Sequence, residues 1–194
     1  ITVSGFYRRL WIYVPASAGP RAAVVRLHGA GSTSDAALNN TTRLREKADD
    51  AGFVAVFPNG SGTPAGYFWN AGTCCGVGSV IQAGDVGFLD AIADEVRERV
   101  CVDRVVGAGF SNGSMMALRW SCEGQGPDAV VAASGPLLQD VCGGEPVPVV
   151  EVHGTADPVV PLEGGQGENV VFPDAREAFE AVVARNQCTG EPVV

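Results

Sequence analysis

Basic side chains and histidine are scarce in this 194-residue chain, and long apolar runs are absent. Lys and Arg number 13 against 22 Asp and Glu, which gives a net charge of −9 at pH 7. This negative field repels nucleic acid and anionic lipid, so we expect neither as a partner. No apolar run of about 18 residues occurs, so we expect no membrane span. The cysteines lack the paired C-x-x-C spacing of zinc sites, so we expect no metal.

Six cysteines are many for a cytosolic enzyme, and we interpret them as disulfide-forming residues of a secreted, extracellular protein. Six cysteines allow 15 connectivities. Adjacent Cys74 and Cys75 are expected to bond to different partners rather than to each other. The chain starts at Ile1 rather than Met, which is typical of a processed or trimmed chain.

The composition, 46% hydrophobic and 18% charged, fits one α/β domain over residues 1–194. Hydrophobic periodicity predicts the following elements: an antiparallel edge strand over 6–14 that ends at a turn over 16–21, strands over 22–27, 53–57, 129–133 and 149–152, and helices over 41–50, from 85 to about 100, and over 174–186. Asp85 is expected to cap its helix, whose core stripe is Leu89, Ile92, Ala93, Val96 and Val100.

A strand, a tight glycine-rich turn and a helix surround Ser111. Val105 and Val106 favour a strand, whereas Met115 and the residues after it favour a helix. In this context the pattern Gly109-Phe-Ser-Asn-Gly predicts a nucleophile elbow, in which Ser111 is the nucleophile and the Asn112 N–H faces the oxyanion. The alternative is a glycine-rich surface turn.

A second glycine-rich loop, His28-Gly-Ala-Gly-Ser, follows the strand over 22–27. Small residues let backbone N–H groups approach a substrate carbonyl, so Ala30 is the expected second oxyanion donor and Gly29 is expected to line the substrate site. We expect His28 to shape this loop through hydrogen bonds rather than to act as a base.

Asp157 follows the strand over 149–152, later in the chain than Ser111. This order and position are typical of the acid that orients a catalytic imidazole. The alternative role is an Asx-turn before Pro158, which needs no catalysis. Earlier in the chain than Ser111, residues 61–84 form a long loop without helical or strand periodicity. This loop contains Trp69 and is expected to be functional.

Five motifs in this order resemble the secreted esterases grouped as polyhydroxybutyrate depolymerase and feruloyl esterase, akin to carbohydrate esterase family 1. The motifs are Leu27-His-Gly-Ala-Gly-Ser, Pro58-Asn-Gly-Ser-Gly, Trp69-Asn-Ala-Gly-Thr-Cys-Cys-Gly, Gly109-Phe-Ser-Asn-Gly-Ser-Met-Met-Ala and His153-Gly-Thr-Ala-Asp-Pro-Val-Val-Pro. The resemblance covers nearly the whole chain.

The resemblance implies an α/β-hydrolase fold, with a mostly parallel sheet and helices on both faces, and no cofactor. It implies Ser111 as nucleophile, Asp157 as acid, and Ala30 and Asn112 as oxyanion donors, with the Trp69 loop as a wall of the acyl pocket. The substrate would be a carboxylic ester, either a hydroxyalkanoate polyester or an aromatic or acetyl ester on plant polysaccharide.

The chain departs from the family in one respect, because the family's catalytic histidine lies on a loop after one further strand. The only histidines here, His28 and His153, occupy positions that the family fills with structural His-Gly pairs. The expected explanation is that the last strand and its histidine lie outside this sequence, on a continuation of the chain or on a second chain or fragment. In the family, a cysteine placed like Cys188 pairs with one further along.

Two alternatives to this explanation remain. The chain could be a degenerate, non-catalytic domain that binds an ester or a glycan. Alternatively, His28 or His153 could move to serve as the base.

Overall fold

The computed structural model describes residues 2–3, 6–16, 19, 22–36, 43–139, 142–167 and 170–190. Within these residues, no helix combines the length and the apolar character that crossing a bilayer requires. The described residues leave out the first two residues of the helix expected over 41–50. They also leave out most of the turn expected over 16–21.

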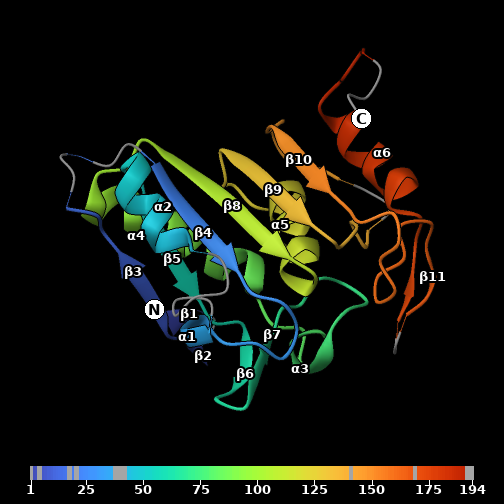
Figure 1. The fold of residues 1–194 in the computed structure, drawn as a ribbon, viewed down its shortest axis with the longest axis horizontal. Helices are drawn as coiled ribbons and strands as arrows, with labels where there is room; N and C mark the ends of the chain where they lie inside the picture. The colour runs from blue at the N-terminus through green and yellow to red at the C-terminus, as the bar shows by residue number, and fades with distance from the viewer. Residues whose placement is uncertain are drawn as a thin grey trace.

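A six-stranded sheet forms the centre of the molecule, with the strand order β10-β9-β8-β4-β5-β3 (Figure 1). Its strands are β3 (Leu10–Tyr13), β4 (Ala22–Leu27), β5 (Val54–Pro58), β8 (Arg104–Phe110), β9 (Ala129–Ala133) and β10 (Val149–Val152). All neighbouring pairs are parallel except β3 with β5. The parallel strands therefore bring their carboxyl ends to one edge, where ligands of open α/β sheets bind.

The antiparallel edge strand expected over residues 6–14 is confirmed only in its second half. β3 pairs with β5 at the edge of the sheet, as predicted. The first part, β2 (Phe6–Tyr7), instead pairs with β1 (Thr2–Val3) in a separate two-stranded ribbon. The strand thus divides at Arg8, whose buried side chain pairs with Asp85 rather than facing solvent.

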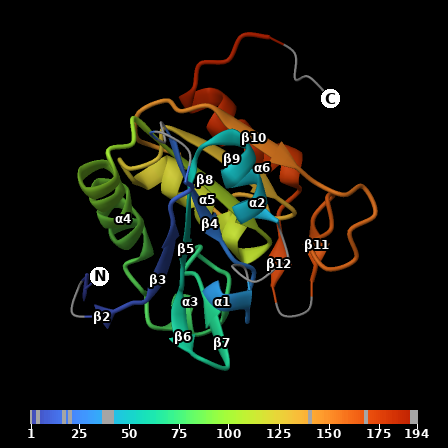
Figure 2. The same cartoon turned by 60° about the vertical axis from the view of Figure 1, so that its left-hand side comes forward.

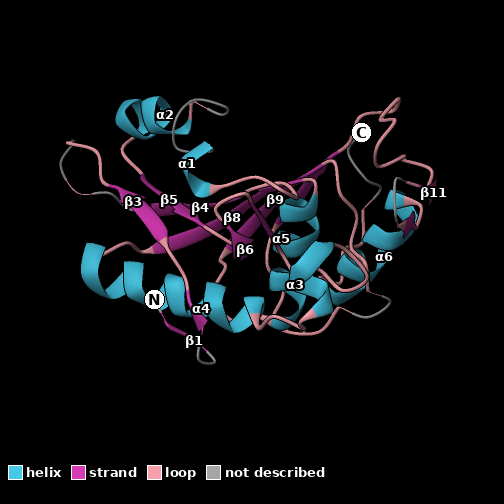
Figure 3. Ribbon diagram, turned by 90° about the horizontal axis from the view of Figure 1, so that it is seen from below, coloured by secondary structure: helices cyan, strands magenta, loops and turns pink. Residues whose placement is uncertain are grey.

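Helices cover both faces of the sheet, as Figure 3 shows. The short α1 (Ser34–Ala36) and α2 (Leu44–Ala51) lie on one face. The opposite face carries α4 (Asp85–Val100) and α5 (Asn112–Glu123). Beside α5, next to β10, lies α6 (Ala175–Arg185), with the ribbon β11 (Gly165–Gln166) and β12 (Val171–Phe172) nearby. The predicted two-sided arrangement is confirmed.

The main core lies between the sheet and the helices α4 and α5. The predicted stripe of α4 is buried as expected, apart from Val100, which is half-buried at the helix end. Asp85, however, does not cap α4 through its side chain, because Gly84 occupies the capping position. The Asp85 carboxylate instead accepts from the Asn70 N–H at 2.6 Å and pairs with Arg8.

The segment 61–84 is not the structureless loop that its sequence predicts. It forms a hairpin of β6 (Ser61–Thr63) and β7 (Gly66–Phe68), followed by α3 (Gly76–Val80), which lies beside β7 (Figure 2). The two strands are too short to show the alternation of apolar and polar residues that predicts a strand. They are held by non-local bonds, since Tyr67 exchanges backbone hydrogen bonds with Gly31 and Ser32 at 2.9 and 3.0 Å.

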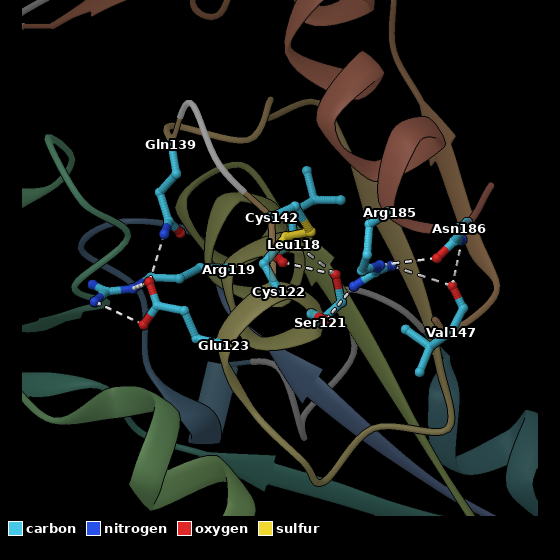
Figure 4. The surroundings of a disulfide bond; sticks show 10 residues. All are labelled: Leu118, Arg119, Ser121, Cys122, Glu123, Gln139, Cys142, Val147, Arg185 and Asn186. Atoms are coloured by element: carbon cyan, nitrogen blue, oxygen red, sulfur yellow. Dashed lines mark hydrogen bonds and ion pairs between the residues drawn. A yellow bond between two sulfur atoms is a disulfide. The ribbon is translucent and has the colours of Figure 1, made fainter. Parts of the chain in front are cut away.

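Two disulfides form among the described residues. Cys122 bonds to Cys142 at 2.03 Å and ties α5 to the segment before β10 (Figure 4). The expectation for the adjacent cysteines is wrong, because Cys74 bonds to Cys75. The turn before α3 brings the two together: the Ala71 N–H donates to the Cys74 carbonyl at 2.8 Å, and the Cys75 N–H donates to the Trp69 carbonyl at 3.3 Å.

The other two cysteines, Cys101 and Cys188, are exposed and free. The expectation that all six form disulfides is therefore confirmed for four residues and wrong within this chain for Cys101, whereas the expected partner of Cys188 lies further along than this sequence, so its pairing stays a prediction. Cys188 follows α6, which is fixed to the rest of the molecule by hydrogen bonds from Arg185 to the carbonyls of Ser121 and Val147 (Figure 4).

Candidate active site

Ser111 occupies the turn between β8 and α5, in a backbone conformation that non-glycine residues rarely adopt. Its φ is 54° and its ψ is −122°. Close packing surrounds the turn: a Cβ on Gly109 would lie 2.0 Å from the Gly113 carbonyl oxygen, and one on Gly113 would lie 2.3 Å from the Leu27 carbonyl oxygen. Only glycine fits at these two positions. The strained turn predicted from the sequence is present.

The loop after β4 lies against this turn. A Cβ built on Gly29 would be 3.6 Å from the Cβ of Ser111. Ala30, the next residue, is exposed, and Gly31 uses its N–H to bond to Tyr67. Asn112 is the first residue of α5, so its N–H has no partner within the helix. The structure therefore places Asn112 directly after Ser111 and packs Gly29, the neighbour of Ala30, against the same turn.

His28 is buried, and both of its ring nitrogens have backbone partners. Nδ1 lies 2.8 Å from the Gly29 carbonyl oxygen, and Nε2 accepts from the Gly60 N–H at 3.1 Å. Its neutral ring stacks at 5.0 Å against Trp69. Burial lowers the pKa of His28 to about 4. The predicted structural role is confirmed, because no lone pair remains to accept a proton from Ser111.

Asp157 lies in a turn beyond β10. Its Oδ1 accepts from the N–H groups of Val160 and Val159, at 3.0 and 2.9 Å. These bonds lower the pKa of Asp157, so the group is a carboxylate at neutral pH. Oδ2 lies 4.0 Å from His153 Nε2. The Asx-turn that the sequence offered as the alternative role is therefore present, but it uses Oδ1 only, so Oδ2 can still orient another group.

Backbone bonds at the edge of the sheet connect the Asp157 turn to Ser111. The Ser111 N–H donates to the Ala133 carbonyl, and the Ser134 N–H donates to the Val152 carbonyl, both at 2.9 Å. Ser134, like Ser111, has a positive φ, of 53°. A hydrogen bond from the Ser134 side chain also helps to lower the pKa of Asp157. Nothing in the sequence singled out Ser134, since a lone serine after a strand carries no motif.

His153 and Glu151 form a buried pair under the Asp157 turn. His153 Nε2 lies 2.8 Å from the Val160 carbonyl oxygen, and Nδ1 lies 3.7 Å from Glu151 Oε1. Both Nδ1 and Oε1 are buried without another hydrogen-bond partner in the described part of the chain. Burial raises the pKa of Glu151 to about 7, while the charge of His153 opposes this shift. His153 is thus fixed by Val160 and supports the turn.

The expectation that Trp69 contacts the substrate is wrong for this conformation. Its side chain has 0% exposure, because it lies in the core, with the indole N–H donating to the His28 carbonyl at 3.0 Å. The side chain of Asn112 bonds to both backbone groups of Trp69, accepting from its N–H at 2.7 Å and donating to its carbonyl at 3.1 Å. The sequence did not reveal this second role of Asn112. Trp69 therefore anchors the loop rather than lining a pocket.

The site thus combines a serine, a carboxylate and two candidate oxyanion donors, whereas each histidine of the chain is held by the backbone. Within the described ranges, no group of three or more His, Cys, Asp or Glu side chains could hold a metal ion. The arrangement has the parts of an acyl-transfer site except for an imidazole beside Ser111.

A family model and several esterase sequences match much of the chain. A family model described as phospholipase/carboxylesterase matches residues 80–182, more than half of the chain. Feruloyl esterase B of Piromyces equi is 33% identical over 177 residues, 82% of this chain and 30% of that protein. The putative esterase NocK of Nocardia uniformis subsp. tsuyamanensis is 32% identical over 158 residues, 77% of this chain and 44% of that protein. The chain spans less than half the length of these two relatives.

Solved structures share the fold. Esterase PE8 aligns with a TM-score of 0.61 and 23% identity, covering 81% of this chain and 79% of that one. The Bacillus cereus carboxylesterase aligns with a TM-score of 0.66 and 16% identity, covering 92% and 81%. The chain therefore has the α/β-hydrolase fold and belongs to the phospholipase/carboxylesterase family.

Proposed function

We propose that this chain carries the nucleophile, the acid and the oxyanion donors of a secreted serine esterase, which hydrolyses feruloyl or acetyl esters of plant polysaccharide. The observation that carries this proposal is the strained turn at Ser111, packed against the loop of Gly29 and Ala30. A strained serine at a strand-to-helix turn is typical of a hydrolase nucleophile, because the conformation exposes Oγ at the carboxyl edge of the sheet.

In the proposed reaction, Ser111 Oγ attacks the ester carbonyl carbon and loses its proton to a base. The N–H groups of Ala30 and Asn112 stabilise the oxyanion of the tetrahedral intermediate, and the positive end of α5 adds to this stabilisation. The intermediate expels the alcohol, which takes the proton, and leaves an acyl-serine. Water, deprotonated by the same base, then releases the acid and restores Ser111.

The base in this proposal is an imidazole from outside these 194 residues, from a further segment of the protein or from another chain. We infer this because backbone groups hold the rings of both His28 and His153. Asp157 Oδ2, which the N–H groups of Val159 and Val160 do not use, lies at the same edge of the sheet as Ser111 and would orient that imidazole.

The substrate class rests on the relatives. Feruloyl esterase B is named for feruloyl esters, and its similarity covers most of this chain. A secreted location is supported by the disulfide between Cys122 and Cys142, since such bonds persist in oxidising compartments.

The test uses the full-length natural protein and its Ser111→Ala variant, assayed on feruloylated and acetylated xylan oligosaccharides and on hydroxybutyrate oligomers. Release of ferulate or acetate that the substitution abolishes supports the proposal. Faster hydrolysis of the hydroxybutyrate oligomers would assign a polyester substrate instead. Xylan binding without hydrolysis of any substrate would identify a non-catalytic binding domain.

A further inference from the structure

A cavity of about 610 Å³ lies apart from the candidate active site. It is open to solvent on one side, the segment Tyr7–Arg9, the β6–β7 hairpin and α3 border it, and none of Ser111, Ala30, Asn112 or Asp157 lines it. Its volume lies within the range of roughly 300–1,000 Å³ that is typical of small-molecule sites. The reaction proposed above leaves this cavity without a role.

Exposed apolar side chains gather around this cavity. Tyr7 is 78% exposed, and Ile81 and Val77 are 45% and 39% exposed, and all three line it. Tyr67 and Phe68 of β7, both half-buried, also line it. Apolar side chains that cluster at a hollow lose water on ligand binding, so this lining favours a ligand with a flat apolar part.

The charge at the cavity is positive, although the chain as a whole has a net charge of −9. Among the described residues, no Asp or Glu lines the cavity, whereas two arginines do. Arg8 is already engaged, since it pairs with Asp85 and lies over the Phe88 ring at 4.5 Å. Arg9 is exposed, and no carboxylate of the described residues pairs with its guanidinium. An unpaired guanidinium without a neighbouring acid favours an anionic group in the ligand, and a planar carboxylate matches its geometry.

We propose that this cavity is a binding site for a small aromatic carboxylate. Arg9 holds the carboxylate, while the ring lies among Tyr67, Phe68 and the apolar residues of α3. The site does not require hydrolysis at Ser111. If the proposed function holds, however, a hydroxycinnamate released from a feruloyl ester belongs to this class of ligand.

The position of the cavity connects it to the active site. Tyr67, which lines the cavity, exchanges backbone hydrogen bonds with Gly31 and Ser32, next to Ala30. A ligand held against β7 therefore contacts the element that fixes the proposed oxyanion loop. Amide resonances of Gly31 and Ser32 should shift when the cavity is occupied, which provides a local readout of binding.

The test compares trans-cinnamate with trans-cinnamamide, which has the same ring but no charge, by calorimetric and NMR titration. The protein is the 194-residue chain with Ser111→Ala, so that no covalent chemistry at the nucleophile contributes. We expect cinnamate to bind about tenfold more tightly than the amide, because the charged hydrogen bonds to Arg9 are lost with the amide.

Arg9→Gln should remove this preference, whereas Arg104→Gln, an exposed arginine elsewhere with the same change in charge, should leave it intact. Equal affinity for the two ligands, no binding of cinnamate, or a preference that survives Arg9→Gln would overturn the proposal. None of these outcomes bears on the esterase reaction, since every variant lacks the nucleophile.

Discussion

The side-chain amide of Asn112 pairs with the backbone of Trp69, accepting from its N–H at 2.7 Å and donating to its carbonyl at 3.1 Å. One residue thereby serves two purposes. Its backbone N–H begins α5 at the proposed oxyanion site, and its side chain attaches the loop before α3 to the nucleophile turn. The loop and the turn are therefore coupled through a single buried amide.

Asn112→Ala should lower the free energy of unfolding by about 2–3 kcal/mol, because it leaves the buried N–H of Trp69 without its partner and removes one hydrogen bond to the Trp69 carbonyl. Urea unfolding followed by fluorescence measures this change. Asn186→Ala is the matched control, since the half-buried Asn186 side chain also makes two hydrogen bonds, donating to the Val147 carbonyl and accepting from Arg185 Nε, but its partners can reach water, so the substitution should cost about 1 kcal/mol. Equal losses in the two variants would contradict the role of Asn112.

Trp69→Ala should destabilise the protein by about 4 kcal/mol, because it removes a fully buried side chain from the core. Trp69→Phe keeps most of the ring volume but loses the bond to the His28 carbonyl, so a loss of about 1–2 kcal/mol is expected. Thermal unfolding and the ratio of rates on feruloyl and acetyl esters are measured together. A change in this ratio without loss of stability would return Trp69 to the substrate pocket.

Gly113→Ala should disrupt the nucleophile turn, since the new Cβ would lie 2.3 Å from the Leu27 carbonyl oxygen, and two backbone segments would have to separate. We expect a loss of about 3 kcal/mol or more. Gly29→Ala is the control, because its Cβ would meet atoms no closer than 3.5 Å and should change stability by about 0.5 kcal/mol or less. Circular dichroism melting curves distinguish the two variants, and a Gly113→Ala protein of unchanged melting temperature would refute the packing described here.

Stability should depend on pH through Glu151, whose pKa burial raises from 4.5 to about 7. The folded state holds this proton more tightly than the unfolded chain does. The stabilisation from this proton is therefore fully present below about pH 4.5 and disappears as the pH rises through about 7, with a size of about 3 kcal/mol. Asp157, whose pKa is lowered, acts in the opposite direction at lower pH.

Glu151→Gln isolates this contribution, because the amide cannot titrate but can still donate to His153 Nδ1. Unfolding free energies measured from pH 4 to pH 8 should fall with rising pH less steeply in this variant than in the parent. Glu163→Gln, at an exposed position, should keep the slope of the parent. Parallel curves for all three proteins would show that the buried pair does not hold a proton.

The sequence predicted those parts of the fold that local patterns encode. The strands at Ala22–Leu27, Ala129–Ala133 and Val149–Val152 have the expected bounds, because each is a β-branched or apolar run between turn residues. The turn at Ser111 was also predictable, since its glycines are required by contacts within a few residues and with the adjacent strand.

Other features depend on contacts between distant segments and left no local signal. The β6–β7 hairpin is held by Ser32, the burial of Trp69 depends on Asn112, and the carboxylate of Asp85 is used by Arg8 rather than by its own helix. The bond between Cys74 and Cys75 likewise depends on how the turn before α3 folds. The sequence therefore did not predict the hairpin, and residue type alone gave the wrong role for Trp69, for Asp85 and for the two adjacent cysteines.

The most direct test of the account is the rate at which a fluorophosphonate labels Ser111, measured by intact mass and peptide mapping. The full-length natural protein should gain one adduct on Ser111, and its Ser111→Ala variant should gain none. The 194-residue chain should react at least about a thousandfold more slowly, because neither of its histidines can act as the base. An adduct at another residue, no adduct in the full-length protein, or equal rates in the two proteins would contradict the account.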